Sequence, residues 1–128
     1  MIFAPTYENK SIDFLKEDDI TSLFCNLLDN AVEAATYMQD GIIELSSYRQ
    51  ESTSFAVVTL ANSCRINPLK ENDQLASTKP DKLKHGYGLK IIRRIVNDYE
   101  GEIQHYYSDE EHFFHTIIIL KPHGSQYS

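Results

Sequence analysis

Apolar residues recur with helical spacing over residues 18–38. At about 100° per residue they fall on one broad arc, whose members are Ile20, Leu23, Phe24, Leu27, Leu28, Ala31 and Ala35. A polar stripe follows one edge of this arc and consists of Asn26, Asn30 and Glu33. Asparagine is a poor residue for a helix interior because its amide competes for backbone groups. The pattern predicts an amphipathic helix with a polar edge, and ordinary solvation would explain that edge if it stood alone.

The two ends of this helix carry recognisable signals. Asp18 or Asp19 is expected to cap the N-terminus, because a carboxylate accepts hydrogen bonds from free backbone N–H groups and complements the helix dipole. Asp40-Gly41 is expected to end the helix. Residues 1–17 are expected to form an irregular lead-in with a short strand around Ser11–Leu15.

The middle of the chain predicts a hairpin and then a long loop. Strand-like runs at residues 42–49 and 55–61 flank the polar residues 50–53, a pattern typical of a β-hairpin. Residues 62–84 have no apolar periodicity. Such a long loop within a compact domain is a functional lid or a disordered segment.

A second helix and a second hairpin are expected after this loop. The helix is expected to open at Gly86 and to end at Glu100-Gly101, with an apolar face of Leu89, Ile92, Ile95, Val96 and Tyr99. Strands at residues 102–107 and 113–120 would follow, and residues 122–128 form a polar tail. The predicted fold is α+β, a two-layer α/β sandwich with a mixed, mostly antiparallel sheet packed on helices.

Composition narrows the class of protein. The chain has 128 residues, of which 41% are hydrophobic and 24% charged, as expected for one globular domain. Its net charge of -7 argues against nucleic acid or an anionic membrane as the main partner. Two cysteines without metal-ligand spacing suit a reducing compartment. No signal peptide and no apolar run long enough to span a membrane are recognised.

Two motifs carry the candidate chemistry. Asn26 to Ala35 reads Asn-Leu-Leu-Asp-Asn-Ala-Val-Glu-Ala-Ala, and residues 84–92 read Lys-His-Gly-Tyr-Gly-Leu-Lys-Ile-Ile. Glycines at the start of a helix let backbone N–H groups approach phosphate oxygens. A P-loop is absent, and a dinucleotide fingerprint would need a third glycine at Ile91. Together, the two stretches resemble the N-box and second glycine box of the GHKL ATPase and histidine-kinase superfamily, most closely its quorum-sensing-type sensor kinases.

This resemblance covers residues 18–121 and implies the Bergerat ATP-binding fold. It implies ATP and Mg²⁺ as ligands, with Asn30 as the Mg²⁺ ligand and Asn26 near the phosphates or a bound water. Lys79 is expected to pair with the terminal phosphates, and its alternative is an ordinary surface lysine. The implied nucleotide-binding set is Asn26, Asn30, Asn62, Lys79, His85, Gly86, Gly88 and Leu89.

The sequence departs from the superfamily at two places. An Asp-x-Gly-x-Gly box usually reads adenine, but Asn62-Ser63-Cys64 stands there, and the Asn62 amide oxygen is expected to accept the adenine amino hydrogen bond instead. ATP-hydrolysing members have a glutamate base four residues before the Mg²⁺ asparagine. Asn26 stands there and cannot accept a proton at any useful pH. The γ-phosphate is therefore expected to pass to a nucleophile other than water.

The function implied is that of an ATP-binding catalytic domain of a two-component sensor histidine kinase. None of the five histidines has the helical context of a phosphoacceptor, so no catalytic residue is expected in this chain. The expected partners are a helical-hairpin phosphoacceptor domain of the same kinase and a response regulator, and the expected location is the cytoplasmic part of a membrane-bound sensor. A degenerate nucleotide-responsive interaction module and a free-standing kinase of the anti-sigma-factor type are the alternatives.

Overall fold

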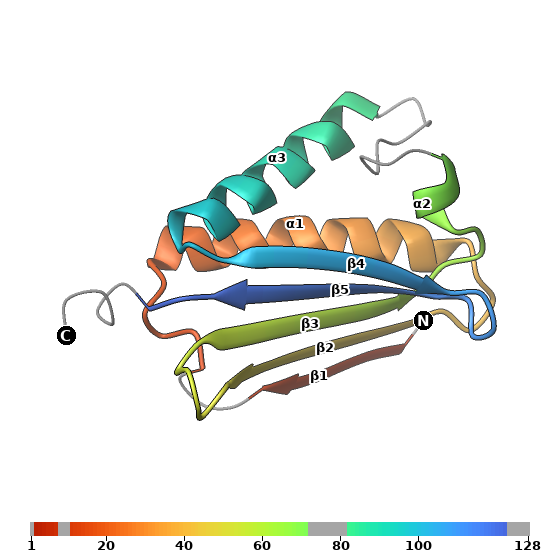
Figure 1. Cartoon of the computed structure of the whole chain (residues 1–128). Coiled ribbons are helices and arrows are strands. Elements are labelled where there is room, and N and C mark those ends of the chain that lie inside the picture. Colours follow the sequence, from red (N-terminus) through yellow and green to blue (C-terminus); the bar gives the residue numbers. More distant parts are fainter. Residues whose placement is uncertain (1, 8–10, 72–81, 123–128) are drawn as a thin grey trace.

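The computed structural model describes residues 2–7, 11–71 and 82–122, which form a five-stranded mixed sheet with helices on one face (Figure 1). The elements in chain order are β1 (Ile2–Tyr7), α1 (Glu17–Thr36), β2 (Ile42–Arg49), β3 (Ala56–Ser63), α2 (Pro68–Glu71), α3 (Lys82–Asp98), β4 (Glu102–Ser108) and β5 (Phe113–Leu120). The strand order is β1-β2-β3-β5-β4. Only the β1–β2 pair is parallel. The predicted α+β two-layer fold is confirmed.

The N-terminal prediction is wrong. The first residues form β1, which pairs with β2 from Ile2↔Ile42 to Tyr7↔Ser47, rather than an irregular lead-in. Residues 11–15 form turns, not a strand, and they pack into the core through Ser11 and Leu15, which are 2% and 5% exposed. β1 contains Pro5, which a sheet tolerates at an edge because the missing N–H is not needed there.

The start of α1 also differs from the prediction. The N-cap residue is Lys16, with no side-chain cap, and Asp18 and Asp19 both lie in the first helical turn. Their carboxylates still complement the helix dipole from there. Tyr99 takes over part of the capping role, because its hydroxyl accepts a hydrogen bond from the Lys16 N–H at 3.0 Å and donates one to Asp19 at 2.9 Å.

α3 ends at Asp98, close to the expected Glu100-Gly101, whereas α1 ends at Thr36 with Tyr37 as its C-cap, four residues before the expected Asp40-Gly41. An acidic residue followed by glycine comes after both helices. The left-handed position belongs to the acidic residue in each case, with φ of 58° at Asp40 and 51° at Glu100. At the end of α3 the Glu100 N–H donates to Asn97 O and the Gly101 N–H to Val96 O, the hydrogen-bond pattern of a Schellman motif. The glycines are needed for close approach, since a Cβ on Gly41 would lie 2.5 Å from the Ala35 carbonyl oxygen.

The core lies between the sheet and the apolar faces of α1 and α3, and it confirms both predicted helix faces. Leu23, Leu27, Ala31 and Ala35 of α1 are buried, and Ile20, Phe24 and Leu28 pack against the same cluster. The predicted face of α3 is buried throughout, with exposures between 0% and 9% for Leu89, Ile92, Ile95, Val96 and Tyr99. Their sheet-side partners include Ile43, Val58, Leu60, Ile118 and Leu120.

Tyr99 ties the end of α3 to the start of α1, so we expect Tyr99→Phe to destabilise the domain by about 1–2 kcal/mol. The ring stays buried in the variant, whereas the Lys16 N–H and the Asp19 carboxylate both lose a partner. Chemical denaturation measures the effect. Tyr48→Phe removes a hydroxyl from a tyrosine that is 42% exposed, and this control should change stability by less than about 0.5 kcal/mol. Equal effects of the two substitutions would contradict the capping role of Tyr99.

Candidate functional site

The sequence-predicted site residues within the described ranges come from α1, β3 and α3. Asn26 and Asn30 lie one helical turn apart on α1 and are both half-buried. β3 ends at the same end of the molecule as α1, and α3 begins there (Figure 1). Asn62 lies one residue before the end of β3. The fold therefore directs the N-box, the asparagine after the central strand and the glycine box toward one end of the helix layer.

Asn26 and Gly88 are in contact across the α1–α3 interface. An ideal Cβ built on Gly88 would lie 2.8 Å from Asn26 Oδ1 and 3.6 Å from its Cγ. The Asn26 amide nitrogen donates a hydrogen bond of 2.6 Å to the Ser22 carbonyl. This bond to the preceding turn turns the amide oxygen toward α3. The structure thus brings the two sequence motifs together, although about sixty residues separate them in the chain.

Asn62 faces the helix layer. Its side chain lies on the same side of β3 as the core residues Val58 and Leu60, because side chains alternate along a strand. It is 3% exposed. Its amide nitrogen donates to the Ser63 carbonyl at 3.1 Å. The amide oxygen, the atom expected to accept from adenine, takes no part in this bond. A carboxamide held by one hydrogen bond in a buried place has a fixed direction, as base recognition requires.

The helix of the glycine box begins earlier than predicted. α3 starts at Lys82, so Gly86 and Gly88 lie inside the helix rather than at its opening. Lysine and leucine are good helix formers, and the run Lys82-Leu83-Lys84 precedes the glycines. The free N–H groups of the first turn therefore belong to residues 82–85. The side chains of residues 82–87, including His85, and all of Lys79 lie outside the described residues, whereas Leu89 is buried at 9% exposure.

The chain that leaves β3 is anchored to the β4–β5 hairpin. The Cys64 N–H donates to His112 O at 2.8 Å, and the Tyr107 hydroxyl donates to Cys64 O at 2.6 Å. His112 Nδ1 lies 3.1 Å from the same hydroxyl. Burial raises the pKa of Tyr107, which keeps the phenol protonated as a donor. Cys64, the first residue after β3, thus has a fixed position. The loop predicted for residues 62–84 begins two residues later than expected, because Asn62 and Ser63 belong to β3, and it contains the short helix α2.

His105 lies on β4, and its imidazole is largely enclosed by neighbouring side chains. Its ring stacks on Phe114 at 5.3 Å between centroids, and its Nδ1 lies 3.2 Å from Thr116 Oγ1. Among the described residues, Nε2 is the only buried side-chain nitrogen or oxygen with no hydrogen-bond partner. Burial and, to a smaller extent, the Arg93 charge lower the pKa of His105 from 6.5 to about 4. The imidazole is therefore neutral at physiological pH.

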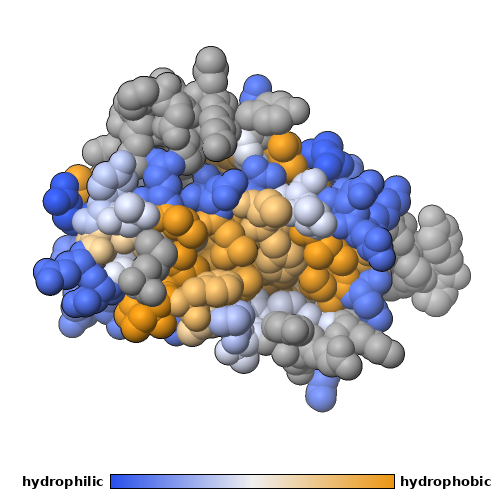
Figure 2. Space-filling model, turned by 180° about the vertical axis from the view of Figure 1, so that it is seen from behind, coloured by the Kyte–Doolittle hydropathy of each residue, from blue (hydrophilic) through white to orange (hydrophobic). Residues whose placement is uncertain are grey.

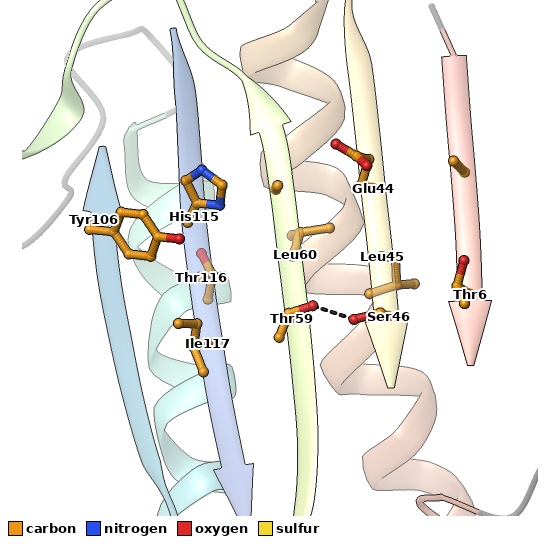
Figure 3. A pocket seen from close by; sticks show the side chains of 12 residues that line it. Thr6, Glu44, Leu45, Ser46, Thr59, Leu60, Tyr106, His115, Thr116 and Ile117 are labelled. Atoms are coloured by element: carbon orange, nitrogen blue, oxygen red, sulfur yellow. Dashed lines mark hydrogen bonds between the residues drawn. The ribbon is translucent and has the colours of Figure 1, made fainter. Parts of the chain in front are cut away.

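The opposite face of the sheet carries a shallow hollow of about 420 Å³ (Figure 3). Its lining includes Thr6, Glu44, Ser46, Thr59 and His115. Tyr106 and His115 stack there at 4.3 Å, a contact between sheet neighbours. This face points away from the helix layer, because the core-facing residues of the same strands alternate with these. The hollow is separated by the sheet from the nucleotide-site candidates.

On the side of the molecule opposite to the view of Figure 1, apolar residues form a band across the middle of the surface (Figure 2). Exposed large apolar side chains of the described residues include Phe3 on β1, at 49%, and Val32 on α1, at 44%.

In the part of the chain that the structure describes, no helix combines the length and apolar character needed to cross a membrane.

Comparison of the sequence with protein-family models matches the GHKL domain over residues 15–120. The match covers most of the chain, including α1, the hairpins and α3, so this protein belongs to the GHKL domain family. No curated protein matches it in sequence.

Solved structures with the same fold include histidine kinases. The histidine kinase domain of a blue-light activated kinase from Erythrobacter litoralis has a TM-score of 0.68 and 16% identity, over 94% of this chain and 55% of that one. The catalytic domain of histidine kinase ThkA has a TM-score of 0.71 and 23% identity, over 94% and 79%. Full-length ShkA in complex with AMPPNP has a TM-score of 0.66 and 16% identity, over 93% and 25%. The chain thus spans about half of the Erythrobacter domain.

Proposed function

We propose that this chain is the ATP-binding catalytic domain of a two-component sensor histidine kinase. The observation that carries the proposal is the contact between Asn26 and Gly88, because it joins the two motifs that a GHKL domain uses for nucleotide. Family membership and the likeness to histidine kinase catalytic domains support it. ShkA, which shares the fold, is described with the ATP analogue AMPPNP bound.

The residues fit Mg·ATP. Mg²⁺ prefers oxygen ligands and is commonly held by one or two side chains together with substrate phosphates and water. Asn30 supplies such an oxygen from a half-buried position one turn beyond Asn26, and it would hold the ion. When bound there, Mg²⁺ would offset the negative charge of the phosphates during phosphoryl transfer. Asn62 would accept the adenine amino hydrogen bond, and His85, Gly86, Gly88, Leu89 and Lys79 complete the proposed nucleotide-binding set.

The proposed reaction is transfer of the γ-phosphoryl group to a histidine of another domain. Asn26 stands where hydrolytic relatives carry a glutamate base, and a carboxamide does not take a proton from water. Its amide nitrogen also donates to Ser22 O, which suits a positioning role. The chain's own residues would bind and orient the nucleotide, and the attacking imidazole would come from a helical-hairpin partner domain. The sequences of both motifs support a quorum-sensing-type kinase. Such a domain would lie in the cytoplasmic part of a membrane-bound sensor, and the sensor would signal to a response regulator.

Titration calorimetry with a non-hydrolysable ATP analogue, with and without Mg²⁺, tests the proposal. Wild type is expected to bind in a Mg²⁺-dependent way. Asn30→Ala should lose about 10- to 100-fold in affinity, together with the dependence on Mg²⁺, because it removes the proposed metal ligand. Asp29→Ala, an exposed neighbour on the same helix, is the matched control and should bind like wild type.

Phosphoryl transfer needs its own test. Mixing the chain with the phosphoacceptor hairpin of its parent kinase and radiolabelled ATP should produce an acid-labile phosphohistidine. Nucleotide binding without any transfer would favour a nucleotide-responsive interaction module, a reading that the missing Asp-x-Gly-x-Gly box supports. Absence of both binding and transfer would overturn the kinase proposal.

A further inference from the structure

Gly88 occupies a place where glycine is intrinsically unfavourable. It is the seventh residue of α3 and is buried. A helical glycine lowers the folding equilibrium constant about fivefold relative to alanine. The space around it gives a reason for its presence, since a Cβ there would lie 2.8 Å from Asn26 Oδ1. Real Cβ atoms do not come this close to another heavy atom, so one of the two groups would have to move.

The Asn26 carboxamide is not free to move aside. Its Nδ2 is held by the 2.6 Å hydrogen bond to the Ser22 carbonyl on the same helix. A helix also excludes one of the three χ1 rotamers for most side chains, because it clashes with the preceding turn. Displacing the amide oxygen from α3 would break the bond to Ser22 or force a less favourable rotamer. The obstacle that a side chain at position 88 would meet is therefore a fixed one.

We propose that Gly88 is a positioning residue whose missing side chain seats the Asn26 carboxamide against α3. The contact sets the separation between α1, which carries Asn30, and α3, which carries the glycine box. This inference rests on the proposed function only for its effect on nucleotide. It differs from a role in phosphate contact, because it assigns the need for glycine to a side chain of the other helix rather than to a ligand.

A double-mutant cycle of Gly88→Ala and Asn26→Ala, measured by urea unfolding without nucleotide, tests this role. In the wild-type background, Gly88→Ala should lower the folding equilibrium constant about threefold or more, because the added methyl meets the carboxamide. With Asn26→Ala the obstacle is gone, since the Asn26 Cβ lies 3.9 Å from the position of the new methyl. There, Gly88→Ala should raise the folding constant about fivefold through helix propensity. Equal effects in the two backgrounds would overturn the inference.

Binding of the ATP analogue with Mg²⁺ gives the second readout of the same four proteins. Gly88→Ala should lower the affinity about tenfold in the wild-type background and produce no further loss beside Asn26→Ala. If glycine is instead required for a phosphate to approach the bare backbone, the loss should be equal in both backgrounds, and the inference fails. Absence of binding by wild type would sink the proposed function, whereas the unfolding cycle would still decide the role of Gly88.

A control on α3 separates helix propensity from the contact. Lys90 is exposed two residues further on the same helix. Comparing Lys90→Gly with Lys90→Ala measures the glycine penalty at a site without a facing side chain, and this difference should be about fivefold in the folding constant in both Asn26 backgrounds. A dependence of the Lys90 difference on Asn26 would show that the coupling is general to the helix and would contradict a specific contact at Gly88.

Discussion

Gly101→Ala is expected to destabilise the domain by about 3–4 kcal/mol, the largest loss that we predict for a single methyl group. A Cβ on Gly101 would lie 2.0 Å from the Ile119 carbonyl oxygen and 3.2 Å from Leu120 Cδ2. The obstacle is backbone of the neighbouring strand β5, which pairs with β4 from Glu102↔Ile119 onward. The strands must separate or the turn must open. Thermal or urea unfolding measures the effect.

Glu100→Gly is the matched control for this substitution. Glu100 is the residue with φ of 51° at the end of α3, a conformation that costs an L-residue about 1 kcal/mol and glycine much less. We expect this neighbouring exchange to stabilise the domain by up to about 1 kcal/mol. A loss below about 1 kcal/mol for Gly101→Ala, or no difference in sign between the two variants, would show that the contact between this turn and β5 yields easily.

The second large expected effect is a loss of stability in acid caused by His105. In the unfolded chain its imidazole takes up a proton near pH 6.5, whereas the folded-state pKa is about 4. The unfolded state therefore binds more protons between these values, and stability falls as the pH is lowered from about 6.5 to 4. The loss from this one group should reach about 2–3 kcal/mol. Urea unfolding at several pH values, with NMR titration of the imidazole, measures it.

Two variants isolate the histidine. His105→Gln removes the titrating group and should flatten that part of the pH profile, at some cost in stability at neutral pH because the stacking on Phe114 is lost. His115→Gln removes a histidine from the other face of the same hairpin and should leave the profile in place. An imidazole of His105 that titrates near pH 6.5 in the folded protein would contradict the expected burial effect.

The helices and hairpins whose residues follow a local pattern of apolar and polar positions could be predicted from the sequence. The faces of α1 and α3 follow from apolar spacing, and both hairpins follow from short polar turns between strand-like runs. β1 could not be found this way, because its pairing partner lies about forty residues away and Pro5 is atypical of a strand. The N-cap of α1 was misplaced because the hydroxyl of Tyr99, the residue that follows α3, accepts the Lys16 N–H hydrogen bond in place of an aspartate.

The membership of the candidate site remains a prediction, and the structure describes the geometry of part of it. Asn26 and Asn30 could be singled out because carboxamides are unusual on the edge of a core helix, whereas Asn62 was named from the family resemblance alone. The start of α3 at Lys82 was missed because glycine weakens a helix. The facing Asn26 side chain gives a reason for glycine at position 88. Local sequence carries no information about such a contact between distant segments.

The hydrogen bond between Tyr99 and Asp19 joins the end of α3 to the start of α1 and is a point about which the two helices can rotate. Tyr99 follows the end of α3 and Asp19 lies in the first turn of α1, with Arg94 reaching the same carboxylate at 3.6 Å. Asn30 is eleven residues further along α1, or about 16 Å at 1.5 Å per residue. A rotation of α1 by about 5° around this point moves Asn30 by about 1.4 Å and leaves the hydrogen bond between Tyr99 and Asp19 intact. A small change in the angle between the helices therefore moves Asn30, the proposed metal ligand, further than it moves Asp19.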